Sequence, residues 1–208
     1  MLTSRFWTAA LAGAAVIVVP VGADTYEFTF TGMTTSMSGS PFGDWGDVAV
    51  GQPVTVRYTF ASDAPDQSAP ANQGRFAILD YTLSIGTTSR TTHGQGQITK
   101  QLFSFVHAYY AISEWDAGDG ALWRSTLALE DFLTDAWDGQ TDALPLDLDI
   151  GDFPTRKIKL DYVDGARGQS FNIVASVDTF TSRIVPAPAA ALALALGLTP
   201  WARRRRSA

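Results

Sequence analysis

The side chains best suited to acid and base chemistry are three glutamates and two histidines: Glu27, Glu114, Glu130, His93 and His107. Glycoside hydrolysis needs two carboxyl groups held about 5 to 10 Å apart across a cleft. Glu114 is the most suggestive, because Trp115 and Asp116 follow it and a carboxyl beside an indole can bind or cut sugar. A turn carboxylate beside a packed tryptophan explains the same residues, so a glycan hydrolase remains a remote alternative.

Other catalytic groups are scarce. The chain has no cysteine, and no serine lies in a Gly-x-Ser-x-Gly elbow. His93 falls in a polar, glycine-rich stretch, whereas His107 lies in an apolar run on the same side as Tyr109. A partly buried histidine with a hydrogen-bond partner is the favoured interpretation of His107. We therefore predict no catalytic residue, no cofactor and no enzyme.

Acidic residues crowd one short segment that contains Asp142, Asp147, Asp149 and Asp152. Carboxylate oxygens suit Ca²⁺, which makes Asp147, Asp149 and Asp152 weak calcium candidates. The segment lacks the spacing of an EF-hand loop, with Ile158 where the last glutamate would stand. Alternation with leucine and isoleucine favours a strand over 144–150 with a polar aspartate face, and no metal site.

Tryptophans suggest a second function. Exposed on one face, they could stack on sugar rings as in carbohydrate-binding modules, and the residues concerned are Trp45, Trp115, Trp123 and Trp137. Buried tryptophans are the usual alternative in an all-β domain. A carbohydrate-binding module that uses surface tryptophans is therefore the alternative function.

The elements that must position these residues are strands. Apolar and polar residues alternate with the two-residue period of half-buried strands in eight runs: 26–31, 54–60, 76–85, 102–112, 122–129, 144–150, 158–163 and 171–180. Stretches 36–51 and 86–97 are expected as ligand-accessible loops, and 128–137 as either a short helix or a strand. The pattern predicts an all-β fold, an antiparallel, jelly-roll-like β-sandwich over residues 24–183.

The N-terminus resembles a secretory signal. Arg5 is followed by an apolar run from Phe6 to Val19, and small residues precede Asp24. This order is typical of a signal helix over residues 1–23 that is cleaved between Ala23 and Asp24. The chain is thus expected to be exported.

The C-terminus, residues 184–208, combines a proline motif, an apolar segment expected to form a short helix, and a basic cluster. The motif is Val185, Pro186, Ala187 and Pro188, and the cluster is Arg203, Arg204, Arg205 and Arg206. Arginines after an apolar segment prefer the cytoplasmic side, which places the body outside.

This tail resembles a PEP-CTERM sorting signal, the tripartite tag of exported proteins in Gram-negative bacteria that produce exopolysaccharide. Ala187 stands where that family usually has glutamate. The resemblance implies a membrane-embedded exosortase that recognises Val185, Pro186 and Pro188, cuts near them and releases the body to the cell surface or extracellular matrix. It also implies a small β-sandwich body without a known active site.

Charge excludes one class of partner. Without the two terminal segments, 10 Lys and Arg stand against 21 Asp and Glu, so the body carries about −11. Such a domain repels nucleic acid. The expected partners are the secretion machinery, an exosortase, the inner membrane before processing, and exopolysaccharide in a biofilm, for a non-enzymatic surface or matrix protein.

Overall fold

The computed structural model describes residues 23–118, 120–137, 143–164 and 169–185. Within them the chain forms nine strands and two short 3-10 helices. The strands are β1 (Thr25–Ser38), β2 (Pro53–Ala61), β3 (Gln73–Ile85), β4 (Thr88–Phe103), β5 (Val106–Gly118), β6 (Ala121–Asp131), β7 (Thr155–Asp164), β8 (Gln169–Ser176) and β9 (Thr179–Val185), and the helices are η1 (Gly43–Trp45) and η2 (Ile150–Asp152).

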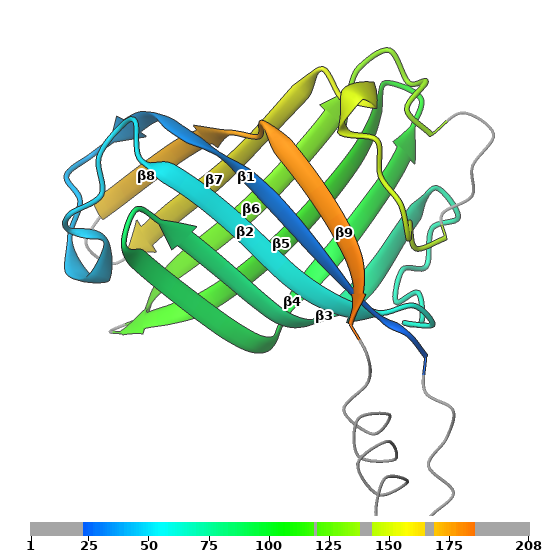
Figure 1. Cartoon of the computed structure of the whole chain (residues 1–208), viewed down its shortest axis with the longest axis horizontal. Coiled ribbons are helices and arrows are strands. Elements are labelled where there is room, and N and C mark those ends of the chain that lie inside the picture. Colours follow the sequence, from blue (N-terminus) through cyan, green and yellow to red (C-terminus); the bar gives the residue numbers. More distant parts are fainter. Residues whose placement is uncertain (1–22, 119, 138–142, 165–168, 186–208) are drawn as a thin grey trace, which may run out of the picture.

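Strands β1 to β8 form one closed antiparallel barrel. Each strand from β2 to β8 pairs with its neighbour in the sequence, and β1 closes the circle by pairing with both β2 and β8 (Figure 1). The first part of β1 also pairs with β9, from Thr25 opposite Val185 to Thr31 opposite Thr179. Strand β1 therefore has partners on both edges.

The closure requires a glycine. At Gly32 the chain passes so close to the end of β8 that an added Cβ would lie 2.0 Å from the carbonyl oxygen of Ser176. The amide of Asp178, just beyond β8, donates to the carbonyl oxygen of Thr31 over 2.8 Å. At this same point the partner of β1 along this edge changes from β9 to β8. Only a residue without a side chain fits there.

The barrel interior is a packed core. Aromatic rings fill the side under β1 and β2, where Phe28 meets Phe60 edge to face at 4.9 Å. The buried tyrosine hydroxyls are paired: Tyr58 with Tyr109 at 2.6 Å between hydroxyl oxygens, and Tyr81 with Ser125 at 2.8 Å. Burial raises the pKa of all three tyrosines well above the usual value, so their hydroxyls stay neutral.

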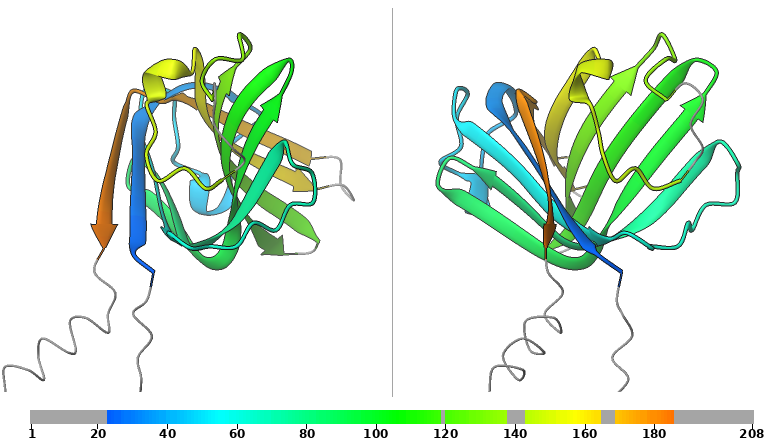
Figure 2. Two further views of the ribbon diagram at one scale, coloured as in Figure 1. Left: turned by 90° about the vertical axis from the view of Figure 1, so that its right-hand side faces the viewer. Right: turned by 45° about the vertical axis from the view of Figure 1, so that its right-hand side comes forward.

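The segment after β6 covers one open end of the barrel (Figure 2). It buries Trp137, Leu148 and Phe153, and the rings of Trp137 and Phe153 are 5.2 Å apart. Asp131 holds the start of this segment, because its carboxylate accepts the backbone N–H groups of Leu133, Asp135 and Ala136 at 2.8 to 3.1 Å. A single buried carboxylate thus organises the turn that leads to the cover.

The prediction of an all-β, antiparallel fold is confirmed, and five of the runs fall at the expected positions as β1, β2, β3, β6 and β7. The sandwich is wrong in its arrangement: the described strands form one closed barrel instead of two packed sheets. Alternation reports that one face of a strand is buried, and it does so equally in a barrel and in a sandwich.

Four local predictions need correction. Stretch 86–97 belongs largely to β4 and is not a loop, run 102–112 contains the β4–β5 turn, and run 171–180 spans two strands. Run 144–150 is an irregular segment that leads into η2, because Leu144 and Leu148 pack against the core at the barrel end while Leu146 is exposed. The ambiguous stretch 128–137 continues β6 to Asp131 and then turns. The two predicted terminal helices lie outside the described residues.

Replacing Gly32 with alanine should destabilise the barrel by about 1 to 3 kcal/mol, because the new methyl group overlaps the backbone of Ser176. Urea denaturation followed by tryptophan fluorescence measures the change. Ser182→Ala, at an exposed position in β9, is the control and should shift the free energy of unfolding by no more than about 0.5 kcal/mol. Equal midpoints for Gly32→Ala and the unaltered protein would contradict this account of closure.

Asp131 should also make stability depend on acid pH. Burial alone would raise its pKa, but the N–H groups of Leu133, Ala136 and Asp135 outweigh burial and lower the pKa to about 2. A lowered pKa contributes stability above about pH 4, and that contribution is lost as the pH falls toward 2.

Asp131→Asn should therefore be less stable than the unaltered protein at pH 7, and the difference should shrink near pH 2. Denaturant midpoints at pH 7, 4, 3 and 2 provide the measurement. A difference that stays constant over this range would show that the carboxylate charge has no part in holding the turn.

Candidate functional site

The predicted acid and base residues do not assemble into a hydrolase pair. Glu114 forms an ion pair with Arg124 at 2.5 Å, and Glu130 pairs with Lys157 at 2.9 Å. Glu130 lies opposite Ala108, six residues along β5 from Glu114. At about 3.4 Å per residue the two positions are about 20 Å apart, well beyond the spacing of glycosidase carboxyls.

The histidines have structural partners. His107 accepts the backbone N–H of Trp137 on Nδ1 at 3.1 Å, so it helps to hold the segment that covers the barrel end. His93 lies on β4 instead of in a loop, and its Nδ1 is 2.6 Å from a carboxylate oxygen of Asp80 on β3. Each histidine therefore links two parts of the chain.

The weak calcium candidates do not converge. Asp147, Asp149 and Asp152 are all exposed. Asp149 caps η2 by accepting the N–H of Gly151 at 2.7 Å, and Asp147 accepts the N–H of its own neighbour Leu148. Among the residues that the structure describes, no group of three acidic or histidine side chains could hold a metal ion. Asp142 lies outside the described residues.

The tryptophans belong to the core. Exposed fractions are at most 7% for the four predicted sugar-stacking residues: Trp45, Trp115, Trp123 and Trp137. Trp123, for example, packs against Tyr162 at 4.9 Å and Trp45 at 6.3 Å. These rings pack inside the protein. The carbohydrate-binding hypothesis assumed exposed tryptophans, and these four are buried.

The structure instead presents a polar surface on the outer sides of five strands as a candidate binding surface. The outer sides of β9, β1, β2, β3 and β4 carry three rows of polar side chains, aligned by the strand pairing. We call this surface the hydroxyl face, and its rows are Thr179–Thr31–Thr55–Ser84–Ser89, then Thr181–Thr29–Arg57–Thr82–Thr91, then Arg183–Glu27–Thr59–Asp80–His93. Serine and threonine occupy most positions, and Arg57 stands at the centre.

The hydroxyl face contains a shallow hollow of about 610 Å³. Its lining is entirely polar: Glu27, Thr29, Thr55, Arg57, Thr82, Ser84, Ser89, Thr181, Ser182 and Arg183. An ion pair of 2.7 Å between Arg183 and Glu27 closes one side. The charges of the lining add to one positive unit, in a protein body that is strongly acidic.

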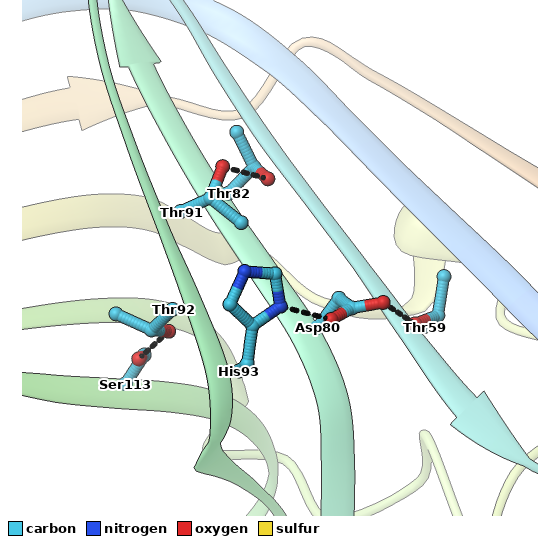
Figure 3. A network of polar contacts seen from close by, with 7 residues as sticks. All are labelled: Thr59, Asp80, Thr82, Thr91, Thr92, His93 and Ser113. Atoms are coloured by element: carbon cyan, nitrogen blue, oxygen red, sulfur yellow. Dashed lines mark hydrogen bonds and ion pairs between the residues drawn. The ribbon is translucent and has the colours of Figure 1, made fainter.

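Side chains at the margin of the hollow bond to one another. Figure 3 shows Thr82 with Thr91 at 2.9 Å, and Asp80 between His93 and Thr59. The figure also shows Thr92 bonded to Ser113, which is a buried pair on the inner side of β4. The margin is therefore fixed by side-chain hydrogen bonds across neighbouring strands.

The centre of the hollow is different. Arg57 has no ion pair with any described residue, and the hydroxyls of Thr29, Thr55 and Thr181 bond to no described side chain. Four polar side chains thus face the hollow with their hydrogen-bonding capacity open to solvent or a ligand.

Sequence reasoning missed this surface, although a signal existed. Threonine or arginine recurs at alternate positions in Thr29-Phe30-Thr31 and in Thr55-Val56-Arg57-Tyr58-Thr59. Such alternation indicates the outer side of each strand. Only the register of five strands, including β9 from the far end of the chain, brings these residues together.

The sorting residues lie at the edges of the described chain. Ala23 and Asp24 directly precede β1, and Val185 is the last residue of β9. Pro186, Ala187, Pro188 and Arg203 to Arg206 lie outside the described residues. In the described part of the chain, no helix has the length and apolarity needed to cross a membrane.

Comparisons with protein-family models, with curated proteins and with solved structures found no match for this chain.

Removing a buried indole should damage stability. Trp123→Ala should cost about 3 to 5 kcal/mol, because it leaves a cavity among Phe42, Trp45 and Tyr162. Phe105→Ala is the matched control: that ring is 68% exposed, and its loss should change stability by no more than about 0.5 kcal/mol. The denaturant midpoints of both variants provide the measurement. An unchanged midpoint for Trp123→Ala would show that the Trp123 ring is not part of the packed core.

Proposed function

We propose that this protein is an exported, non-enzymatic protein of the cell surface or extracellular matrix. A PEP-CTERM-like tail holds it briefly at the inner membrane until an exosortase cuts near Val185, Pro186, Ala187 and Pro188. Arg203 to Arg206 act as the cytoplasmic stop for the apolar segment before them. The barrel is then released to associate with exopolysaccharide.

The main support is the position of the folded unit between the two predicted processing points. The first strand begins at Thr25, two residues after the predicted signal-cleavage residue Ala23. The last strand ends at Val185, where the proline motif begins. Cleavage after Ala23 and within residues 186–188 would leave all nine described strands in one piece.

The relative position of the two ends gives further support. Thr25 and Val185 are register partners in the β1–β9 pair, so β1 begins and β9 ends at the same end of the barrel (Figure 1). An apolar segment that precedes β1 and another that follows β9 would therefore leave the barrel side by side. This arrangement suits a protein whose two terminal segments enter the same membrane from one side.

Association with polysaccharide is favoured over the other roles considered. Without its two terminal segments the body carries a net charge of about −11, which opposes binding to nucleic acid. The hydroxyl face offers groups that both donate and accept hydrogen bonds, as sugar hydroxyls do. The hydroxyl face can bind carbohydrate through hydrogen bonds alone, without aromatic stacking. We therefore keep the carbohydrate-binding alternative with this face, instead of the tryptophans, as the binding surface.

Mass measurement of the mature protein tests the sorting proposal. The surface or matrix species should begin at Asp24 and should lack Arg203 to Arg206, because both terminal segments are removed. Deleting residues 186–208 should abolish retention at the inner membrane, whereas Phe105→Ala should be processed normally. A surface species that keeps all four arginines would contradict the proposal.

A further inference from the structure

We propose that the hydroxyl face is a binding site for a carboxylated polysaccharide, one that contains uronic acid residues. Arg57 would receive a carboxylate of the polymer, and Thr29, Thr55 and Thr181 would bond to its hydroxyl groups. The inference deepens the proposed function and rests on it for the location of the polymer outside the cell. The site itself depends only on the barrel.

The first argument is the state of Arg57. It is exposed at the centre of the hollow and has no ion pair with a described residue. A guanidinium presents five N–H donors in a planar fork that matches a carboxylate with two parallel hydrogen bonds. Charge-assisted bonds of this kind are about twice as strong as neutral ones.

The surroundings of Arg57 supply the polar contacts that a sugar requires. Thr29 lies opposite it on β1 and Thr82 opposite it on β3, whereas Thr55 is two residues away on β2. Neighbouring strands are about 4.8 Å apart, and positions i and i+2 are about 6.8 Å apart. Hydroxyls therefore surround the guanidinium at spacings that one polymer chain can span.

Other outer surfaces of the barrel differ in this respect. On β5 to β8 several outward polar residues are paired with each other: Glu114 with Arg124, Glu130 with Lys157 and Asp161 with Asn172, whereas Thr126 and Lys159, which stand opposite each other, are not. Side chains that are hydrogen-bonded to each other have few free donors or acceptors for a ligand. The hydroxyl face differs because it gathers four open polar groups around one hollow.

Charge favours an acidic polymer over a neutral one. The hollow has no aromatic lining residue on which a neutral sugar could stack. Its lining carries Arg57 and Arg183 against Glu27, which leaves one positive charge at the site. The acidic remainder of the protein repels a polyanion at long range, but at physiological ionic strength that repulsion is screened beyond about 8 Å.

Single contacts on so open a surface are weak. A neutral hydrogen bond contributes about 0.5 to 1.5 kcal/mol, and many are exchanged with water at no gain. A polymer with repeated carboxylates compensates, because successive units rebind at high effective concentration. Binding should therefore be measurable with a polymer and weaker with its short oligomers.

The test uses the full chain in a mild, uncharged detergent, with polygalacturonate as the probe and its carboxyl-reduced, neutral form as the matched polymer. Arg57→Gln should weaken polygalacturonate binding about tenfold or more, and Arg57→Lys should restore part of it. Arg75→Gln removes the same charge from an exposed position of β3 outside the hollow, and it should change binding less than twofold.

The hydroxyls are tested separately. The double variant Thr29→Val and Thr55→Val keeps side-chain shape and removes two hydroxyls, so it should weaken binding severalfold. Thr126→Val, on β6 away from the hydroxyl face, is its control. Denaturant midpoints for each variant show that the barrel is intact.

Three results would overturn the inference. They are equal binding of the acidic and neutral polymers, equal losses for Arg57→Gln and Arg75→Gln, and absence of binding to polygalacturonate. None of them depends on processing of the tail, so a failure of this site and a failure of the sorting proposal are distinguishable.

Discussion

The structure depends on hydrogen bonding along both edges of β1. One edge pairs with β2, while the other pairs first with β9 and then with β8. Because β1 pairs with β2 along one edge and with β8 along the other, the sheet closes into a barrel. The same strand joins the two ends of the described chain. Closure at Gly32, the pairing of Thr25 with Val185 and the five-strand outer surface all follow from this one arrangement.

Closure also decides where function can reside. The interior is filled by aromatic and aliphatic side chains, and its tyrosine, serine and threonine hydroxyls are paired with each other. Those pairs avoid the cost of an unsatisfied buried polar group. The end that faces the cover is held by Asp131 and His107. The proposed binding site lies on the outer surface, where the hydroxyl face has its central groups open.

Individual strands could be predicted from the sequence, but their assembly could not. The alternation in Tyr26 to Thr31 and Val54 to Phe60 identified both the strand and its buried side, because a period of two is a local property. It failed at Leu144 to Ile150, where Leu144 and Leu148 pack against the barrel end as part of the covering segment, without strand pairing. It also misjudged the polar stretch around His93, since a strand with a solvated outer side can carry glycine and serine and still pair with its neighbour β3.

By itself the sequence determined the all-β class, the inward and outward sides of most strands, the absence of cysteine chemistry and the acidic charge of the body. Tertiary structure alone decided that one sheet closes into a barrel, that the four tryptophans are core residues, and that threonines from β9, β1, β2 and β3 lie in common rows around Arg57. The physical reason is register. Which residues stand opposite each other depends on pairings between strands that are distant in the chain. The local alternation of apolar and polar residues does not determine those pairings.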